Sequence, residues 1–405
     1  MVPFLIDFLF SRRYTDESIS IFQYKNGGYA VKRLRVGILG CGKIAAVYAA
    51  NLQNHYQDRL ELLLCADIDA ARAEVFAQEH SIRSVSVDGL ITSAEIDTIL
   101  NLTIPAAHYP LSLAALRNGK HVYSEKPLAM TLKEADELIA EAASHGLYLG
   151  CAPDTFLGGG IQTVCRLLEE DAIGTPVSFA IHMLARGPEY THPRPEFYYE
   201  PGAGPLMDMG PYYITALVAM LGPVKSVFGL GGSVFPNRFC RAPERLGDTF
   251  RTSVDTSVCA VLRLTSGLAG TLHISWDHPH CYWESGAPFI EIRGSKGRIE
   301  CPDPNTFGGS YGAFSDPPEN RIHLFSASGE SSPVALDPDC VTFNARGIGL
   351  YEAARAMEEG QRPVVHAGLA RHVLEVLLGI ERSCQTGQPT EMAEETELKK
   401  FIRFF

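Results

Sequence analysis

The stretch "LRVGILGCGKIAAVYAANL", residues 34–52, decides the fold of the first part of the chain. A run of apolar residues ends at Gly40, and the Ala-rich segment that follows is typical of a helix. Gly40, Gly42 and Ala45 occupy the three small positions of the pattern G-x-G-x-x-G/A. The first permits a tight turn, the second lets the backbone approach a pyrophosphate, and the third allows close packing of helix on strand. The order strand, turn, helix therefore predicts a dinucleotide site.

The first turn of this helix carries Lys43 and Ile44, whose backbone N–H groups we expect to face the phosphates. A second buried strand, "LELLLCAD", ends in Asp67, 22 residues beyond Ala45. A carboxylate there accepts hydrogen bonds from the adenosine ribose and repels a 2'-phosphate, which favours NAD over NADP. The alternative is that Asp67 only caps the following helix.

Strands and helices continue to alternate as far as residue 146, where a glycine ends a helix that begins with a T-x-x-E capping box. Such alternation predicts a parallel sheet with helices on both faces, and these sheets bind ligands at the carboxyl ends of their strands. The residues expected at that edge are Thr103, Pro105, His108, Glu125 and Lys126. For His108, a purely structural role at the helix start is an equal alternative.

The composition and charge of the chain argue against several other classes of function, among them nucleic-acid binding and metal binding. The 405 residues suffice for about two domains, and the net charge of −12 comes without a basic block, so we expect no nucleic-acid partner. Ten cysteines without a C-x-x-C pair indicate reduced thiols and a cytoplasmic protein. The sequence 278–281, His-Pro-His-Cys, has no second cluster to complete a coordination shell, so we predict no metal site. Residues 1–33 are interpreted as a loosely attached extension, neither a signal peptide nor a membrane anchor.

With these residues in view, the sequence resembles the Gfo/Idh/MocA family of glucose-fructose oxidoreductases, inositol dehydrogenases and rhizopine-catabolism proteins. The stretches that carry the resemblance are "GILGCGKIA", "TIPAAHYPLSLAALRNGKHVYSEKPLA", "IQTVCRLLEEDAIGTPV", "GAGPLMDMGPYY" and, near the end, "ARHVLEVLLGIERSCQTGQPTEM". The second of these is the most specific.

The resemblance implies an NAD-binding Rossmann domain, residues 34–153, and an α/β domain, residues 154–405, with a large, mostly antiparallel open sheet. That sheet would cover the nicotinamide and build a homodimer or homotetramer. Strand-like runs separated by glycine turns in the second half favour the same architecture.

The resemblance also assigns the catalytic residues. The lysine of the E-K-P motif is Lys126, expected beside the nicotinamide ribose and the substrate hydroxyl. The family's D-x-G-x-H motif reads Asp208-Met209-Gly210-Pro211-Tyr212, with tyrosine in place of histidine. A tyrosine has an ordinary pKa near 10, and a neighbouring ammonium favours its phenolate, so Lys126 and Tyr212 are expected to take the substrate proton together.

Asp208 and Tyr212 are four residues apart, which would place them on one face of a helix. Pro211 leaves two possibilities: the helix starts near it, or a longer helix contains it. The simpler interpretation is that Asp208 is a helix cap and Tyr212 a core aromatic.

A loop rich in Pro, Gly and aromatics, residues 187–205, is expected near the substrate. Its candidate contacts for a polyhydroxylated ligand are His192, Glu196, Tyr198 and Tyr199, although these could equally pack the loop. Asp154 stands where many relatives have a basic residue, which favours a neutral sugar or cyclitol.

The predicted function is an NAD-dependent dehydrogenase acting on a secondary hydroxyl of a sugar, glycoside or polyol. The first alternative is a glycosidase or lyase that oxidises its substrate transiently and leaves no net NADH. The second alternative is a sugar or NAD sensor without catalysis.

Overall fold

The computed structural model describes residues 33–279, 289–308, 322–337 and 340–393. The chain packs into two compact units, one reaching Leu157 and including Asn344–Arg371, the other formed by Gly158–Phe343 and the chain from His372 onward. The predicted extension lies outside the described residues, apart from residue 33. Among those described, no helix combines the length and apolarity needed to cross a membrane.

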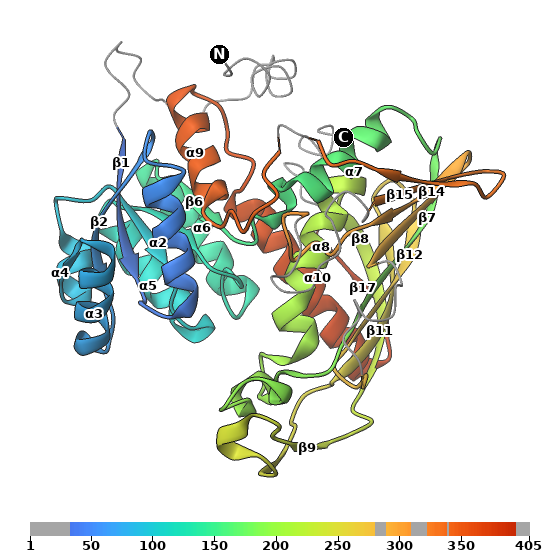
Figure 1. The fold of residues 1–405 in the computed structure, drawn as a ribbon, viewed down its shortest axis with the longest axis horizontal. Coiled ribbons are helices and arrows are strands. Elements are labelled where there is room, and N and C mark those ends of the chain that lie inside the picture. The colour runs from blue at the N-terminus through green and yellow to red at the C-terminus, as the bar shows by residue number, and fades with distance from the viewer. Residues whose placement is uncertain (1–32, 280–288, 309–321, 338–339, 394–405) are drawn as a thin grey trace. The chain divides into compact units, whose positions relative to one another are not determined.

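The first unit is built on a parallel sheet of six strands in the order β3-β2-β1-β4-β5-β6 (Figure 1). Its strands are β1 (Leu34–Leu39), β2 (Leu60–Ala66), β3 (Arg83–Ser84), β4 (Thr98–Asn101), β5 (His121–Ser124) and β6 (Leu149–Cys151). The helices are α2 (Lys43–Asn54), α3 (Ala70–His80), α4 (Val87–Thr92), α5 (Pro105–Arg117) and α6 (Leu132–His145). A sixth helix, α9 (Ile348–Glu358), comes from Asn344–Arg371, where the chain returns to this unit; we call these residues the returning segment. Strands β4, β5 and β6 are almost wholly buried, as expected for a sheet covered on both faces, whereas the two-residue edge strand β3 is not.

Local sequence signals set several of these boundaries. The predicted capping box is present at the start of α6, where the Thr131 hydroxyl accepts from the Glu134 N–H and the Glu134 carboxylate accepts from the Thr131 N–H. Gly146 ends the same helix in the left-handed conformation, φ 63°. The predicted Rossmann-like parallel sheet is confirmed.

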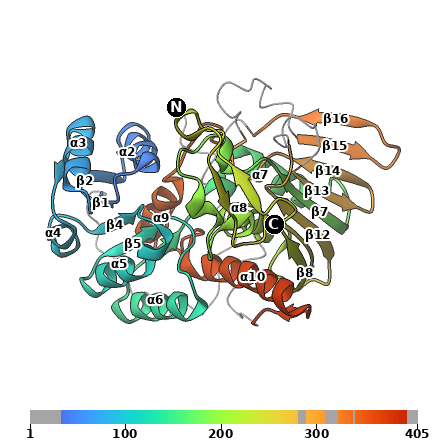
Figure 2. The same ribbon diagram turned by 90° about the horizontal axis from the view of Figure 1, so that it is seen from below.

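The second unit contains a sheet of nine strands in the order β16-β15-β14-β13-β7-β12-β11-β8-β17 (Figure 2). Only the β12–β7 pair is parallel. The strands are β7 (Pro176–Leu184), β8 (Val224–Gly232), β11 (Ser257–Leu264), β12 (Ala269–Ser275), β13 (Ile290–Gly294), β14 (Gly297–Cys301), β15 (Ile322–Ser326), β16 (Ser331–Val334) and β17 (Thr390–Glu391). The predicted large, mostly antiparallel sheet is thus confirmed.

Helices cover one face of this sheet, as Figures 1 and 2 both show. They are α7 (Gly159–Glu169), α8 (Gly204–Leu221) and α10 (Ala367–Thr386). Alternate residues of β11 are buried and exposed, which is the pattern of a sheet packed on one face only. Outside the sheet lie a small hairpin, β9 (Asn237–Phe239) and β10 (Thr249–Arg251), and three short 3-10 helices, η2 (Pro188–Tyr190), η3 (Glu196–Tyr199) and η4 (Pro243–Arg245). A fourth 3-10 helix, η1 (Thr155–Leu157), belongs to the first unit, whose main segment ends at Leu157.

Candidate functional site

The glycine turn between β1 and α2 has the geometry that a dinucleotide requires. Gly40 has φ +96°, and a Cβ there would lie 2.8 Å from the backbone carbonyl of Leu102, so both conformation and space demand glycine. At Gly42, by contrast, a Cβ would meet nothing within 4 Å. Gly42 is also the N-cap of α2 and provides no side-chain cap for the first-turn N–H groups. The turn therefore offers open space at a helix N-terminus, which suits a pyrophosphate.

Asp67 follows β2 and organises the same turn. Its carboxylate accepts the Cys41 N–H at 2.8 Å and the Asp69 N–H at 2.9 Å. The guanidinium of Arg72 lies 3.5 Å from it. The helix α3 is capped by Asp69 and not by Asp67, so the alternative role considered for Asp67 is filled by its neighbour. A carboxylate has about four acceptor positions, so these bonds leave capacity for a ribose hydroxyl.

Lys126 lies in the loop after β5 and is held from both sides. Its backbone N–H donates to Oε2 of Glu125 at 3.1 Å, and the Tyr48 hydroxyl donates to Oε1 of the same carboxylate at 2.8 Å. On the other side, the peptide bond to Pro127 is cis, and the Pro127 carbonyl lies 2.7 Å from Nδ1 of His108. The backbone that carries the lysine is consequently fixed in place.

His108 is buried and connects the ends of two strands. Besides Pro127, its ring contacts the carbonyl oxygen of Thr103 through Nε2 at 3.0 Å. Burial lowers the pKa of His108 below its ordinary value, although both carbonyl contacts oppose the shift. Pro105 is at the N-terminal end of α5, and Thr103 donates its hydroxyl to Asn101 at 2.6 Å. His108 was considered for a structural role and for a role at the dinucleotide site. Both of its ring nitrogens contact backbone carbonyls, which agrees with the structural role.

The returning segment brings Arg346 to the buried Glu125 carboxylate, 3.8 Å away. Asp154 is fully buried beside this segment and accepts the N–H groups of Gly347 at 2.9 Å and Gly349 at 3.1 Å. Burial raises the pKa of Asp154, while Arg346 and the two backbone bonds lower it. Both backbone bonds are accepted by Oδ2, which thus holds this segment, while the buried Oδ1 has no hydrogen-bond partner among the described residues. The expected contact of Asp154 with substrate stays a prediction.

In the second unit, α8 carries both other catalytic candidates. The helix runs from Gly204 to Leu221 with Pro211 inside it, so the longer of the two expected helices is present. Asp208 and Tyr212 therefore share one helix face. The adjacent Tyr213 is fully buried and donates its hydroxyl to Asp303 at 3.0 Å.

The loop that precedes α8 packs both on itself and on other parts of the second unit. The His192 ring meets the rings of Phe197 and Tyr198 edge to face, at 5.3 and 5.5 Å. Tyr199 is buried and donates its hydroxyl to Glu189. Packing accounts for Tyr199, whereas His192 and Tyr198 are half-buried and stay candidates for substrate contact.

Glu196 of the same loop pairs with Arg245 at 2.6 Å. No group of three or more potential metal ligands occurs in the described ranges, and His280 and Cys281 lie outside them.

Sequence reasoning missed Tyr48 and Arg346, the two residues that engage the carboxylate of Glu125. Tyr48 is on the first helix after the glycine turn, where an aromatic looks like an ordinary core residue. Arg346 is separated from Glu125 by more than half of the chain, and no sequence pattern relates the two.

Two family models match the chain. Residues 34–152 match "Oxidoreductase family, NAD-binding Rossmann fold", and residues 161–300 match the "GFO/IDH/MocA C-terminal domain". Among characterised proteins, the myo-inositol 2-dehydrogenase of Thermotoga maritima is 27% identical over 269 residues, covering 66% of this chain and 74% of that protein. The D-xylose dehydrogenase of Paenarthrobacter nicotinovorans is 26% identical over 217 residues, or 51% of this chain and 55% of that one.

Solved structures share the fold. Levoglucosan dehydrogenase, solved in complex with NADH and levoglucosan, has a TM-score of 0.73 at 17% identity, covering 90% of this chain and 100% of that one. An NAD-binding oxidoreductase from Klebsiella pneumoniae has a TM-score of 0.75 at 19% identity, with the same coverage of each chain. Together with the glycine turn and the fixed E-K-P loop, these matches show that the chain belongs to the Gfo/Idh/MocA family of oxidoreductases.

Proposed function

We propose that this protein is an NAD-dependent dehydrogenase that oxidises a secondary hydroxyl of a sugar, glycoside or polyol. The observation that carries the proposal is the loop of Lys126, fixed by Glu125 on one side and by His108 on the other, at the carboxyl edge of the sheet that bears the glycine turn. The named activities of the relatives, on myo-inositol, xylose and levoglucosan, support this substrate class.

Oxidation of an alcohol removes a hydride from carbon and a proton from oxygen. Bound NAD supplies the hydride acceptor, so the protein must take the proton. We assign the proton to Tyr212, with the ammonium of Lys126 favouring the phenolate and Asp208 holding the substrate hydroxyl. The family motifs and the common helix face of Asp208 and Tyr212 support this assignment.

Adjacent tyrosines provide a matched test of the assignment. In Tyr212→Phe and Lys126→Met, kcat for NADH formation on the best substrate of a sugar and polyol panel should fall about 10²- to 10⁴-fold, the usual contribution of a proton-transfer group. Tyr213→Phe, which removes the hydroxyl bound to Asp303, should keep kcat within about threefold, since it touches no reacting group.

A Tyr212→Phe variant with an unchanged kcat would remove Tyr212 from the mechanism. Release of an aglycone without net NADH would replace the dehydrogenase with the glycosidase or lyase. Binding of sugars without any turnover in the native protein would indicate a sensor.

Asp67 supports NAD as the preferred cofactor. The carboxylate adjoins the glycine turn, where it would repel a 2'-phosphate. The nearby cation, Arg72, contacts the carboxylates of both Asp67 and Asp69, so it does not leave a positive charge for that phosphate. We expect kcat/KM for NAD to exceed that for NADP at least tenfold, and Asp67→Ala to narrow the ratio. A native enzyme that prefers NADP would contradict this assignment.

The uncovered face of the nine-stranded sheet supports the proposal of a homo-oligomer. Phe228 and Leu230 of β8 and Val261 of β11 are 38%, 64% and 51% exposed, and Phe228 lies directly opposite Val261 in the strand register. An apolar patch of this kind marks an interaction surface. Light scattering should give a dimer or tetramer mass that drops for Leu230→Glu; a native monomer would contradict it.

A further inference from the structure

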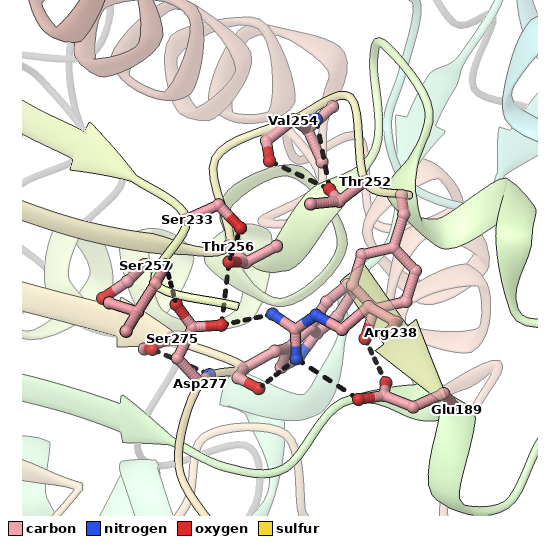
Figure 3. A network of polar contacts seen from close by, with 12 residues as sticks. Glu189, Ser233, Arg238, Thr252, Val254, Thr256, Ser257, Ser275 and Asp277 are labelled. Atoms are coloured by element: carbon pink, nitrogen blue, oxygen red, sulfur yellow. Dashed lines mark hydrogen bonds and ion pairs between the residues drawn. The ribbon is translucent and has the colours of Figure 1, made fainter. Parts of the chain in front are cut away.

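A buried ion cluster joins three segments at one side of the second unit (Figure 3). Arg238 of β9 contacts Glu189 of η2 and Asp277, which follows β12, and each of the three side chains is at most 6% exposed. The guanidinium also donates to the carbonyl of Trp276 at 3.1 Å, and Tyr199 donates its hydroxyl to Glu189. Because breaking a buried pair of this kind costs several kcal/mol, the three segments are held in fixed positions.

The two acidic members of this cluster anchor three residues nearer the surface. Glu189 directly precedes Tyr190. Asp277 forms an isolated antiparallel bridge with Arg186. The N–H of Arg241, which follows β9, donates to the carbonyl of Glu189 at 2.8 Å. The cluster thus fixes the backbone of Arg186, Tyr190 and Arg241.

The two arginines share the ring of Tyr190. The guanidinium carbon of Arg186 lies 5.1 Å from the ring centroid and that of Arg241 lies 5.9 Å from it. Contact with an aromatic face orients a guanidinium and leaves its N–H donors available at its edge. Within the described parts of the chain, neither guanidinium has a carboxylate within ion-pair distance.

The charges of this group do not cancel. Arg186, Arg238 and Arg241 contribute three positive charges, and Glu189 and Asp277 contribute two negative ones, so one positive charge remains beside Tyr190. The net charge of the protein is −12, so carboxylates are in excess, yet no described carboxylate pairs with Arg186 or Arg241. The remaining charge suits a ligand with one acidic group.

The same segment leads into the helix that carries the catalytic candidates. From Tyr190 the chain passes through η3, which contacts α8, and reaches the first turns of α8 with Asp208. The backbone of this connection is fixed as well, because both the N–H and the hydroxyl of Ser253 donate to the carbonyl of Tyr199 at 3.0 Å. Tyr190 therefore belongs to the segment, residues 187–205, that the sequence assigned to substrate contact, Arg186 directly precedes it, and Arg241 is attached to it through the carbonyl of Glu189.

We propose that Arg186, Tyr190 and Arg241 bind the acidic group of the substrate, a carboxylate or a phosphate. The inference rests on the proposed dehydrogenase function and narrows its substrate class from sugars, glycosides and polyols in general to sugar acids or sugar phosphates. Guanidinium groups suit both anions because they bind two oxygens at once.

Calorimetric titration of the full-length protein with NAD present tests the proposal, using matched pairs of ligands. Glucuronate is compared with glucose to test a carboxylate, and glucose 6-phosphate with glucose to test a phosphate. The acidic member of at least one pair should bind about 10- to 100-fold more tightly, as expected for one or two charge-assisted hydrogen bonds, and its affinity should fall as salt rises.

In the variants Arg186→Met and Arg241→Met, the Kd of the preferred acidic ligand should rise at least tenfold, while the Kd of its neutral partner stays the same. Arg382→Met is the matched control: it deletes the same charge from an exposed position of α10 and should leave the Kd unchanged. Equal Kd values for the acidic and neutral members of both pairs, or no measurable binding of any acidic probe at millimolar concentration, would overturn the proposal.

The assay of NADH separates this proposal from the function on which it rests. Arginine-dependent binding of an acidic sugar without NADH formation would retain the anion site and reject the dehydrogenase. NADH formation with equal kcat/KM on the acidic and the neutral member of each pair, unchanged in Arg241→Met, would retain the dehydrogenase and reject the anion site.

Discussion

Substitution of Asp154 distinguishes a structural carboxylate from one that contacts substrate. One of its oxygens accepts the N–H groups of Gly347 at 2.9 Å and of Gly349 at 3.1 Å, which attaches the returning segment to the end of the first sheet. The side chain is fully buried. Little space exists for rearrangement, since a Cβ at Gly349 would lie 2.6 Å from the Tyr123 hydroxyl.

The expected magnitude follows from those two bonds. A hydrogen bond to a charged group contributes about 1.5–3 kcal/mol, and Asp154→Ala would also leave two buried N–H groups without an acceptor. Burial offsets part of this, because the raised pKa of Asp154 shows that its ionised form is costly in the fold. We expect a net loss of about 3 kcal/mol for Asp154→Ala and about 1 kcal/mol for Asp154→Asn, which keeps an acceptor oxygen.

Urea unfolding followed by circular dichroism measures these losses, and the KM for substrate is measured in parallel. Both variants should retain the native KM within about threefold, because the carboxylate is engaged inside its own unit. A KM raised more than tenfold in Asp154→Asn with unchanged unfolding would refute the structural interpretation and return Asp154 to the substrate site.

Three further substitutions test other buried groups. Gly40→Ala should abolish NAD binding in an equilibrium titration, because the added carbon would meet the backbone of Leu102, just after β4; native-like affinity would contradict the assignment of the turn. Burial raises the pKa of Glu352 to about 7, so the native protein should lose up to about 3 kcal/mol of stability as pH rises from about 4.5 through 7. Glu352→Gln, which can still accept the Val364 N–H, should remove that loss, and parallel stability curves for the two proteins would contradict it. Arg238→Met should destabilise the second unit by about 3–5 kcal/mol, because it leaves two buried carboxylates without their cation, and an unchanged melting temperature would contradict the stabilising role of the ion cluster.

Local patterns made much of the first unit predictable. The turn at Gly40 and the capping box at Thr131 each involve residues within a few positions of one another, so the sequence displays the whole interaction. The E-K-P loop was likewise placed correctly at the end of a strand, β5. The sequence does not show which residues hold this loop in place, because His108 and Tyr48 contact it from helices elsewhere in the unit.

The returning segment shows why other features were not predictable. Residues 344–349 are attached to the first unit by backbone groups: Asn51 donates to the carbonyls of Asn344 and Arg346, and Tyr56 donates to that of Ala345. Backbone acceptors leave no trace in the sequence. A loop that is held in this way looks like any polar connection between two domains.

The pair Tyr212-Tyr213 shows how the structure separates residues that the sequence presents together. Successive residues on a helix point about 100° apart, so the face shared by Asp208 and Tyr212 cannot include Tyr213. The structure accounts for Tyr213 through its bond to Asp303, a partner 90 residues away. Since α8 begins at Gly204 and continues through Pro211, both tyrosines have helical geometry and their difference lies in orientation alone. We therefore expect Phe substitution to affect kcat at position 212, the proposed proton acceptor, and stability at position 213, whose hydroxyl binds Asp303.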